Sequence, residues 1–255
     1  MSAGHSHAGH VRRDSPVHRL PPECKLLATV AFVLVVVSTP RTWLWAFAGY
    51  AVLLAGVALA ARVPVGTVVR RTAIEAPFVA FALLLPFVAR GERVDVLGVA
   101  VSQPGLLGAW NLLAKGTLGV VASILLVATT EQRSLLLGLE RLRLPSRLVQ
   151  IASFMLRYAD VITAEMRRMR IARESRCFTP RSVRSWRVLG HAAGALFVRC
   201  YERGERVHLA MLARGYTGTM PGRTTPSAAL RSWATAFALP VAAGAVLALT
   251  GMIQP

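Results

Sequence analysis

The sequence predicts an all-α, polytopic helical membrane protein. About five transmembrane helices are expected, with two long amphipathic helices before the last of them. Of the 255 residues, 54% are hydrophobic and only 16% are charged, against about 25% charged residues in ordinary soluble domains. The apolar residues form long blocks with almost no charge. The formal net charge of +18 lies between these blocks, mostly in one stretch at residues 131–231.

The chain begins with a polar tail, residues 1–19, that has no apolar run and is therefore not expected to act as a cleavable signal peptide. Neutral imidazoles ligate cobalt, nickel and zinc. The tail histidines alternate in a flexible segment, however, so we expect a disordered tail without an essential metal site. The histidines of the tail are His5, His7, His10 and His18.

A membrane domain with four spans is predicted at residues 20–130, and a final span at 232–255. The apolar blocks are residues 26–38, 43–61, 72–89, 105–129 and 233–253. The first block is short of the roughly 20 residues that a span needs. It is therefore expected to begin at Pro22, with Lys25 reaching the headgroups.

Two ionisable residues lie inside the apolar blocks, and such residues are functional candidates by default. Glu75 follows Arg71 closely and is expected near the cytoplasmic end of its span. Lys115 lies deeper and is expected to bridge two spans.

Charge asymmetry orients the chain. Residues 1–25, 62–71 and 131–231 are strongly basic, whereas the loops that alternate with them carry little or no net charge. Positive charge is retained in the cytoplasm. The sequence therefore predicts a multi-pass protein of the cell membrane with its N-terminus and the 131–231 block in the cytoplasm. The C-terminus is expected outside.

The 131–231 block contains 19 arginines and 7 acidic residues, and two amphipathic helices can be recognised in it. Their apolar residues recur in steps of three and four, which mark one face of an α-helix. Pro145 and Ser146 suit the start of the first helix, and Pro180 separates the two. The stripes are Leu148, Ile151, Met155, Tyr158, Ile162, Met166 and Met169 in one helix, and Trp186, Leu189, Ala193, Leu196, Cys200, Val207 and Met211 in the other.

Both amphipathic helices end in a similar string. The first ends Ser175-Arg176-Cys177 before Phe178, and the second ends Ala213-Arg214-Gly215 before Tyr216. Arginine in a last turn favours the helix dipole, and glycine suits the left-handed position that follows a helix. The repetition indicates a shared role beyond helix termination.

At this point the sequence resembles the transmembrane T component of energy-coupling-factor importers, the cobalt-type CbiQ family. The resemblance covers residues 16–253. It is most specific at the paired Ala-Arg-Gly motifs, of which the second is intact and the first reads Ser175-Arg176-Cys177. The other matching strings are Leu20-Pro21-Pro22-Glu23-Cys24-Lys25-Leu26-Leu27, Arg141-Leu142-Arg143-Leu144-Pro145, Arg157-Tyr158 and Glu165-Met166.

The resemblance implies a non-catalytic subunit of a cobalt or nickel importer, without cofactor or metal of its own. Such a subunit couples a cytosolic, CbiO-like ABC ATPase dimer to a CbiM-like capture subunit in the membrane, with a small CbiN-like accessory subunit. The two cytoplasmic helices would be coupling helices. The ATPase-coupling residues would be Ser175, Arg176, Cys177, Ala213, Arg214 and Gly215. An importer for a vitamin is the alternative.

Other classes find less support. The sequence lacks the Walker A, GxSxG and HExxH strings, and an intramembrane enzyme needs a polar cluster inside a span. A nucleic-acid-binding protein would use the 131–231 block, but the interleaved apolar stripes argue against a solvated basic face. The cysteines lack zinc-site spacing and are expected to be free thiols; they are Cys24, Cys177 and Cys200.

Overall fold

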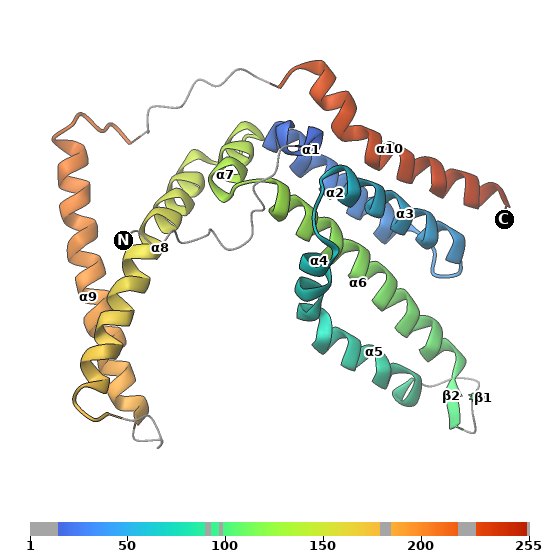
Figure 1. The fold of residues 1–255 in the computed structure, drawn as a ribbon, viewed down its shortest axis with the longest axis horizontal. Helices are drawn as coiled ribbons and strands as arrows, with labels where there is room; N and C mark the ends of the chain where they lie inside the picture. The colour runs from blue at the N-terminus through green and yellow to red at the C-terminus, as the bar shows by residue number, and fades with distance from the viewer. Residues whose placement is uncertain (1–14, 90–92, 97–98, 179–184, 219–227, 254–255) are drawn as a thin grey trace. The chain divides into compact units, whose positions relative to one another are not determined.

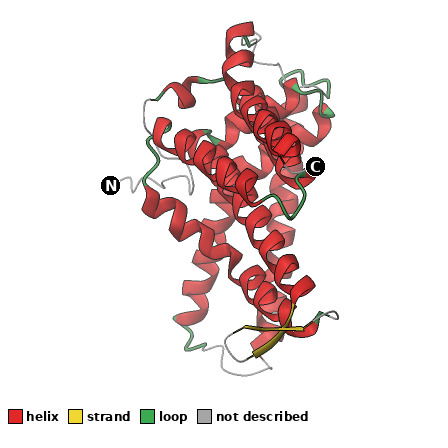
Figure 2. Ribbon diagram, turned by 90° about the vertical axis from the view of Figure 1, so that its right-hand side faces the viewer, coloured by secondary structure: helices red, strands yellow, loops and turns green. Residues whose placement is uncertain are grey.

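The computed structural model describes residues 15–89, 93–96, 99–178, 185–218 and 228–253. The chain divides into two compact units. We call residues 1–142 together with 227–255 the membrane unit, and residues 143–226 the two-helix unit. Nearly all described residues are helical (Figure 1), and helices dominate the second view as well (Figure 2). The expectation of a helical membrane protein is confirmed.

The membrane unit is built from helices in chain order, with one short hairpin among them. Its elements are α1 (Pro16–Arg19), α2 (Pro22–Ser38), α3 (Leu44–Ala60), α4 (Val65–Thr72), η1 (Ala73–Glu75), α5 (Ala76–Val88), β1 (Arg93–Val96), β2 (Val99–Ser102), α6 (Gln103–Thr129), α7 (Gln132–Arg141) and α10 (Leu230–Ile253).

Three helical segments among the described residues are long and apolar enough to cross a membrane, at Val65–Val88, Gln103–Thr129 and Leu230–Met252. They correspond to three of the predicted spans. The other two predicted spans are α2 and α3, which have 17 residues each and are slightly shorter than the usual span of about 20. The count of five stays a prediction.

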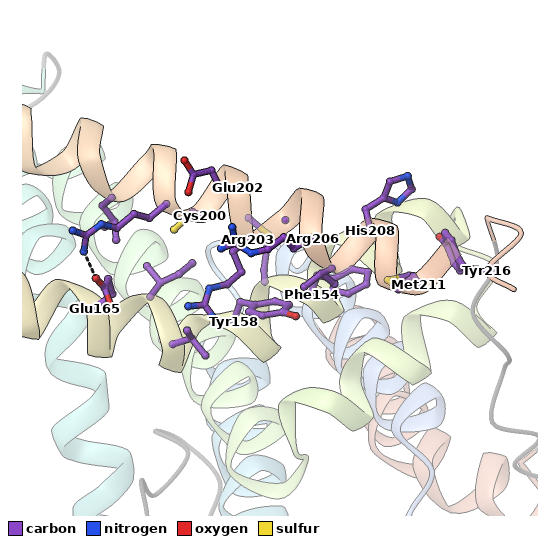
Figure 3. A pocket seen from close by; sticks show the side chains of 17 residues that line it. Phe154, Tyr158, Glu165, Cys200, Glu202, Arg203, Arg206, His208, Met211 and Tyr216 are labelled. Atoms are coloured by element: carbon purple, nitrogen blue, oxygen red, sulfur yellow. Dashed lines mark hydrogen bonds and ion pairs between the residues drawn. The ribbon is translucent and has the colours of Figure 1, made fainter. Parts of the chain in front are cut away.

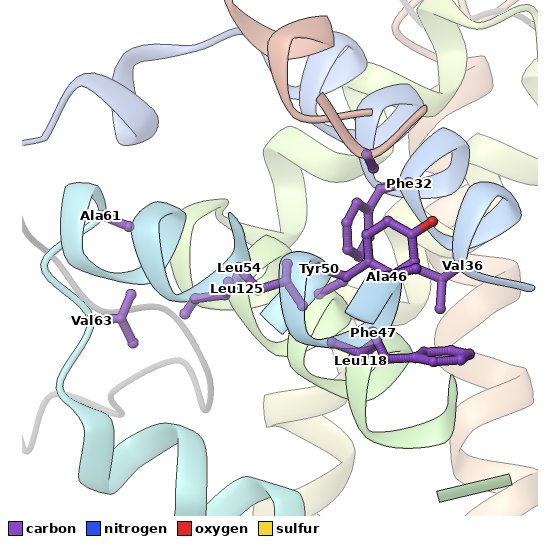
Figure 4. Packing of buried hydrophobic residues seen from close by; sticks show 13 residues of the cluster. Phe32, Val36, Ala46, Phe47, Tyr50, Leu54, Ala61, Val63, Leu118 and Leu125 are labelled. Atoms are coloured by element: carbon purple, nitrogen blue, oxygen red, sulfur yellow. The ribbon is translucent and has the colours of Figure 1, made fainter. Parts of the chain in front are cut away.

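The core of the membrane unit joins α2, α3 and α6 (Figure 4). The Tyr50 ring meets Phe32 and Phe47 edge to face, at centroid distances of 6.1 and 6.3 Å. Its hydroxyl shares a hydrogen bond of 2.9 Å with Thr39 Oγ1. Because a buried hydroxyl without a partner is costly, this bond allows Tyr50 to lie fully within the apolar core.

The third predicted span is interrupted, because the one-turn element η1 lies between α4 and α5. Glu75 ends η1 and is only 6% exposed. Thr117 of α6 donates a hydrogen bond to Glu75 Oε2 at 3.0 Å. Pro77 in the first turn of α5 fits a helix that starts anew there. Glu75 is therefore buried at the break between α4 and α5, and its position near the cytoplasmic end of the span stays a prediction.

Lys115 bridges two helices, as the sequence predicts. Its Nζ donates to the carbonyl of Val37 at 2.7 Å. Val37 belongs to the last turn of α2, where carbonyls lack partners within the helix and attract cations. The lysine thus ties the middle of α6 to the end of α2.

The prediction for Lys25 was wrong in one respect. Helix α2 begins at Pro22 as expected, but Lys25 is only 7% exposed and does not reach outward to headgroups. Its Nζ donates to the carbonyl of Thr129 at 2.9 Å and to Thr130 Oγ1 at 3.2 Å. The Lys25 ammonium group therefore bonds to acceptors inside the protein instead of to water at the headgroups.

Two local features differ from the sequence expectation. Residues 93–102, expected as a loop, contain the antiparallel pair β1–β2, in which Arg93 is opposite Ser102. Valine is frequent in both strands, and β-branched residues favour strands. The end of the polar tail forms the single turn α1, capped by the Ser15 hydroxyl. His5, His7 and His10 lie outside the described residues.

The two-helix unit consists of α8 (Ser146–Glu174) and α9 (Ser185–Leu212). Both amphipathic helices predicted from the sequence are present, and α8 begins at the predicted Ser146, with Pro145 at its N-cap. Pro180, expected between them, lies outside the described residues.

Candidate coupling site

The end of α8 has the hydrogen-bonding pattern of a Schellman motif, in which the residue after the cap is left-handed and two amides bond back to the helix. Cys177 has a φ of 58°. The Cys177 amide donates to the carbonyl of Glu174 at 3.0 Å, and the Phe178 amide donates to that of Arg173 at 3.1 Å. Arg176 is consequently the last residue before the chain reverses.

The end of α9 repeats this geometry residue by residue. Gly215 has a φ of 81°. Its amide donates to the carbonyl of Leu212 at 2.9 Å, and the Tyr216 amide donates to that of Met211 at 3.0 Å. Arg214 occupies the position that Arg176 has in α8. The change from glycine to cysteine in the first string therefore leaves the backbone path of the motif intact.

All six predicted coupling residues are exposed. They form two groups, Ser175, Arg176 and Cys177 at the end of α8 and Ala213, Arg214 and Gly215 at the end of α9. Among the residues that the structure describes, neither arginine pairs with a carboxylate. Each string therefore presents a solvated guanidinium flanked by small side chains.

Contacts between α8 and α9 establish that the helices run antiparallel. Glu165 of α8 accepts hydrogen bonds from Arg168 and from Arg199 of α9. Nearer the start of α8, Gln150 Oε1 accepts a hydrogen bond of 2.9 Å from the Tyr216 hydroxyl. The Ala213-Arg214-Gly215 string thus lies beside the start of α8, and Ser175-Arg176-Cys177 lies at the opposite end of the unit. At 1.5 Å per helical residue, about 40 Å separates them.

A groove of about 530 Å³ lies between the two helices (Figure 3). Phe154 and Tyr158 line it from α8, with their rings stacked at a centroid distance of 6.4 Å. Cys200 and Met211 line it from α9. Hydrogen bonds from Arg168 and then Arg199 lower the pKa of Glu165 below its usual value, so this carboxylate stays ionised at neutral pH and links the helices.

Much of the predicted apolar surface is left uncovered in the two-helix unit. Met155 and Met166 of α8 are 69% and 55% exposed, and Trp186 of α9 is 75% exposed. Isolated exposed apolar residues are normal, but a series along two neighbouring helices marks an interaction surface. Only part of the two stripes is covered within the unit.

Nothing in the described residues suggests a metal centre, because they contain no group of three or more histidine, cysteine or acidic side chains that could hold an ion. The three cysteines are free, as expected. The similar ends of α8 and α9 were identifiable from the repeated string, and the coupling role of their six residues stays a prediction. The hydrogen bond between Gln150 and Tyr216, which positions the second string, had no signal in the sequence.

Comparison with known proteins identifies the family. The family model of CbiQ, described as "Cobalt transport protein", matches residues 13–226. The chain belongs to this family. It is 31% identical over 230 residues to the energy-coupling factor transporter transmembrane protein EcfT of Thermanaerovibrio acidaminovorans, a match that covers 84% of each chain. It is 27% identical over 152 residues to the cobalt transport protein CbiQ of Rhodobacter capsulatus, covering 58% of this chain and 62% of that protein.

Two further relatives define the extent of similarity. The chain spans about half the length of two uncharacterized proteins of Methanocaldococcus jannaschii, to which it is 28% and 35% identical. The family match and the apolar helices together make this CbiQ family member a membrane protein.

Proposed function

We propose that this protein is the transmembrane coupling subunit of an energy-coupling-factor importer, which passes ATP-driven motion from cytosolic ATPases to a separate capture subunit. The observation that carries the proposal is the duplicated helix end. Two arginines, Arg176 and Arg214, occupy the same position of the same backbone motif at opposite ends of one two-helix unit. Two equivalent ends suit a partner that itself has two equivalent subunits, such as an ABC ATPase dimer.

The chemistry of the strings suits docking. Arginine stays charged and offers five donors in a planar fork, which fits carboxylates and carbonyls in a groove. Small neighbours such as Ala213 and Gly215 allow a partner surface to approach the helix end closely. The arrangement is suited to recognition, and we assign no catalytic step to this subunit.

The remaining partners follow from the same proposal. The uncovered apolar side chains of α8 and α9 would meet the capture subunit, which we infer to be CbiM-like and accompanied by a CbiN-like subunit. The ATPases would be CbiO-like, and the transported substrate would be cobalt or nickel. We infer from the charge asymmetry that the N-terminus and residues 131–231 face the cytoplasm, because basic residues are concentrated in cytoplasmic segments.

Co-purification with the ATPases tests the docking role. In mild detergent, Arg176→Ala/Arg214→Ala is expected to lose the ATPases, while the membrane unit keeps its thermal stability. The matched control is Arg167→Ala/Arg206→Ala, which removes two exposed arginines from the same helices away from their ends and should retain the ATPases. Undiminished ATPase binding by the Arg176→Ala/Arg214→Ala variant would refute the proposal.

The substrate requires a separate test. Uptake of radioactive cobalt and of nickel by cells that express the complete transporter should depend on this subunit. If neither ion is taken up but a vitamin is, the cobalt-type assignment is wrong while the coupling role stands.

A further inference from the structure

Two segments that are far apart in the sequence, the start of α2 and the end of α7, meet in the membrane unit. Glu23, in the first turn of α2, forms an ion pair of 2.6 Å with Arg141, the last residue of α7. The Glu23 side chain is 4% exposed and that of Arg141 is 28% exposed. An ion pair with one fully buried partner is sensitive to the loss of the other, because the remaining charge is left without compensation.

A second polar contact lies two residues further along the same turn. Lys25 donates to the carbonyl of Thr129, the last residue of α6, at 2.9 Å. It also donates to Thr130 Oγ1 at 3.2 Å and to the carbonyl of His18 at 3.3 Å. The start of α2 is thereby bound to the end of α6, directly before α7. We call Glu23, Lys25, Thr129, Thr130 and Arg141 the helix-junction clamp.

Backbone packing reinforces the clamp. A Cβ atom on Gly138 of α7 would lie 3.0 Å from the amide nitrogen of Glu23 and 3.1 Å from the carbonyl carbon of Pro22. Both are backbone atoms at the start of a helix and cannot move as a flexible side chain can. Helix α7 therefore sits directly against the first turn of α2, at the residue that pairs with Arg141.

The chain leaves the membrane unit immediately after the clamp. The boundary between the two units falls between Leu142 and Arg143. Arg143 has a φ of 64°, a left-handed conformation that is costly for residues other than glycine. Helix α8 then begins after Pro145. The last element held by the membrane unit is thus separated from α8 by only a short non-helical segment.

We propose that the helix-junction clamp anchors α7 as the fixed base of the coupling helices, with Arg141 as a positioning residue. Because α7 is held, displacement of α8 would pass through the short Leu142–Pro145 segment to α7 and from there to α2 and α6, instead of being lost in movement of α7. The inference rests on the proposed function, because it assumes that ATPases displace the two-helix unit. Beyond the proposed function, the inference names the helix-junction clamp as the place where this displacement would reach the membrane unit.

The ratio of substrate transported to ATP hydrolysed tests the clamp in the reconstituted full transporter. Arg141→Ala is expected to retain the ATPases and ATP hydrolysis, because the coupling strings are untouched. Its transport per ATP should fall by at least about fivefold, the lower end of usual coupling factors. Glu23→Arg/Arg141→Glu, which restores opposite charges, should recover most of the ratio. A merely stabilising ion pair would lower both activities together.

The control variant is Arg133→Ala, which removes an arginine from the same helix α7 outside the clamp and should keep the wild-type ratio. If Arg141→Ala does not fold, Arg141→Lys is measured instead and should show a smaller loss. A wild-type ratio in whichever of these variants folds overturns the clamp proposal while leaving ATPase docking intact. If the wild-type protein binds no ATPases, the proposed function fails, and the clamp proposal fails with it.

Discussion

Replacing Cys177 with glycine should stabilise the end of α8. Cys177 has a φ of 58°, and a left-handed conformation costs a residue with a Cβ about 1–2 kcal/mol. Glycine removes this cost but adds about 0.5–1 kcal/mol of backbone entropy to the unfolded chain. The net gain is therefore about 0.5–1 kcal/mol, which corresponds to a two- to fivefold increase in the population of the ordered helix end, since a tenfold change is about 1.4 kcal/mol.

Hydrogen exchange followed by mass spectrometry measures this population locally. Peptides that cover residues 172–178 of Cys177→Gly should exchange about two- to fivefold more slowly, because the amides of Cys177 and Phe178 are bonded within the motif. Cys177→Ala keeps the Cβ and serves as the matched control, with unchanged exchange. Gly215→Cys should show the opposite effect at the end of α9. Equal exchange in Cys177→Gly and Cys177→Ala would refute the reasoning.

Three further perturbations test polar contacts. Glu75→Gln should keep the free energy of unfolding in detergent within about 1 kcal/mol of the wild-type value, because the amide oxygen still accepts a hydrogen bond from Thr117. Glu75→Ala should lower this free energy by about 1–3 kcal/mol. Equal losses in the two variants would count against a role for this hydrogen bond. Lys115→Met should lower the same free energy by about 1.5–3 kcal/mol through loss of its charged bond to Val37, and Lys115→Arg by less. The pKa of Glu165 is lowered from the ordinary value of 4.5. The contribution of this carboxylate to holding α8 and α9 together is therefore complete above pH 4.5 and is lost as the pH falls through the lowered pKa. Spin-label distances between α8 and α9 should therefore stay constant from about pH 7 to about pH 5 and change below, and Glu165→Gln should produce that change at neutral pH.

Hydrophobicity and periodicity predicted most of the fold. Long apolar blocks identify α3, α6 and α10 because a membrane helix must satisfy its backbone internally and cover itself with apolar side chains. The three- and four-residue steps identify α8 and α9 because their apolar residues share one face. The short pair β1–β2 was missed, since a hairpin of two four-residue strands leaves a weak pattern in a charged loop.

Contacts between distant residues were beyond sequence reasoning. Glu23 and Arg141 are 118 positions apart, and their pairing depends on how closely α7 approaches α2 at Gly138. Lys25 was expected at headgroups because a lysine near a helix end usually extends to water. The carbonyl of Thr129 takes this place only because α6 ends beside α2. By contrast, the similarity of the two helix ends could be predicted, because the repeated string is visible within single short segments; the coupling role of these strings stays a prediction.

The opposite placement of Arg176 and Arg214 has a consequence for affinity. Two attachment points about 40 Å apart on the two-helix unit would make it a bivalent ligand. If the proposed function holds, a single ATPase subunit would reach only one of them, whereas a dimer would engage both. The second contact would then form at an effective concentration set by the two-helix unit instead of by the solution. Loss of either arginine should accordingly weaken ATPase binding nearly as much as loss of both. Any movement that changes the distance between the two ATPase grooves would then alter avidity without changing either contact.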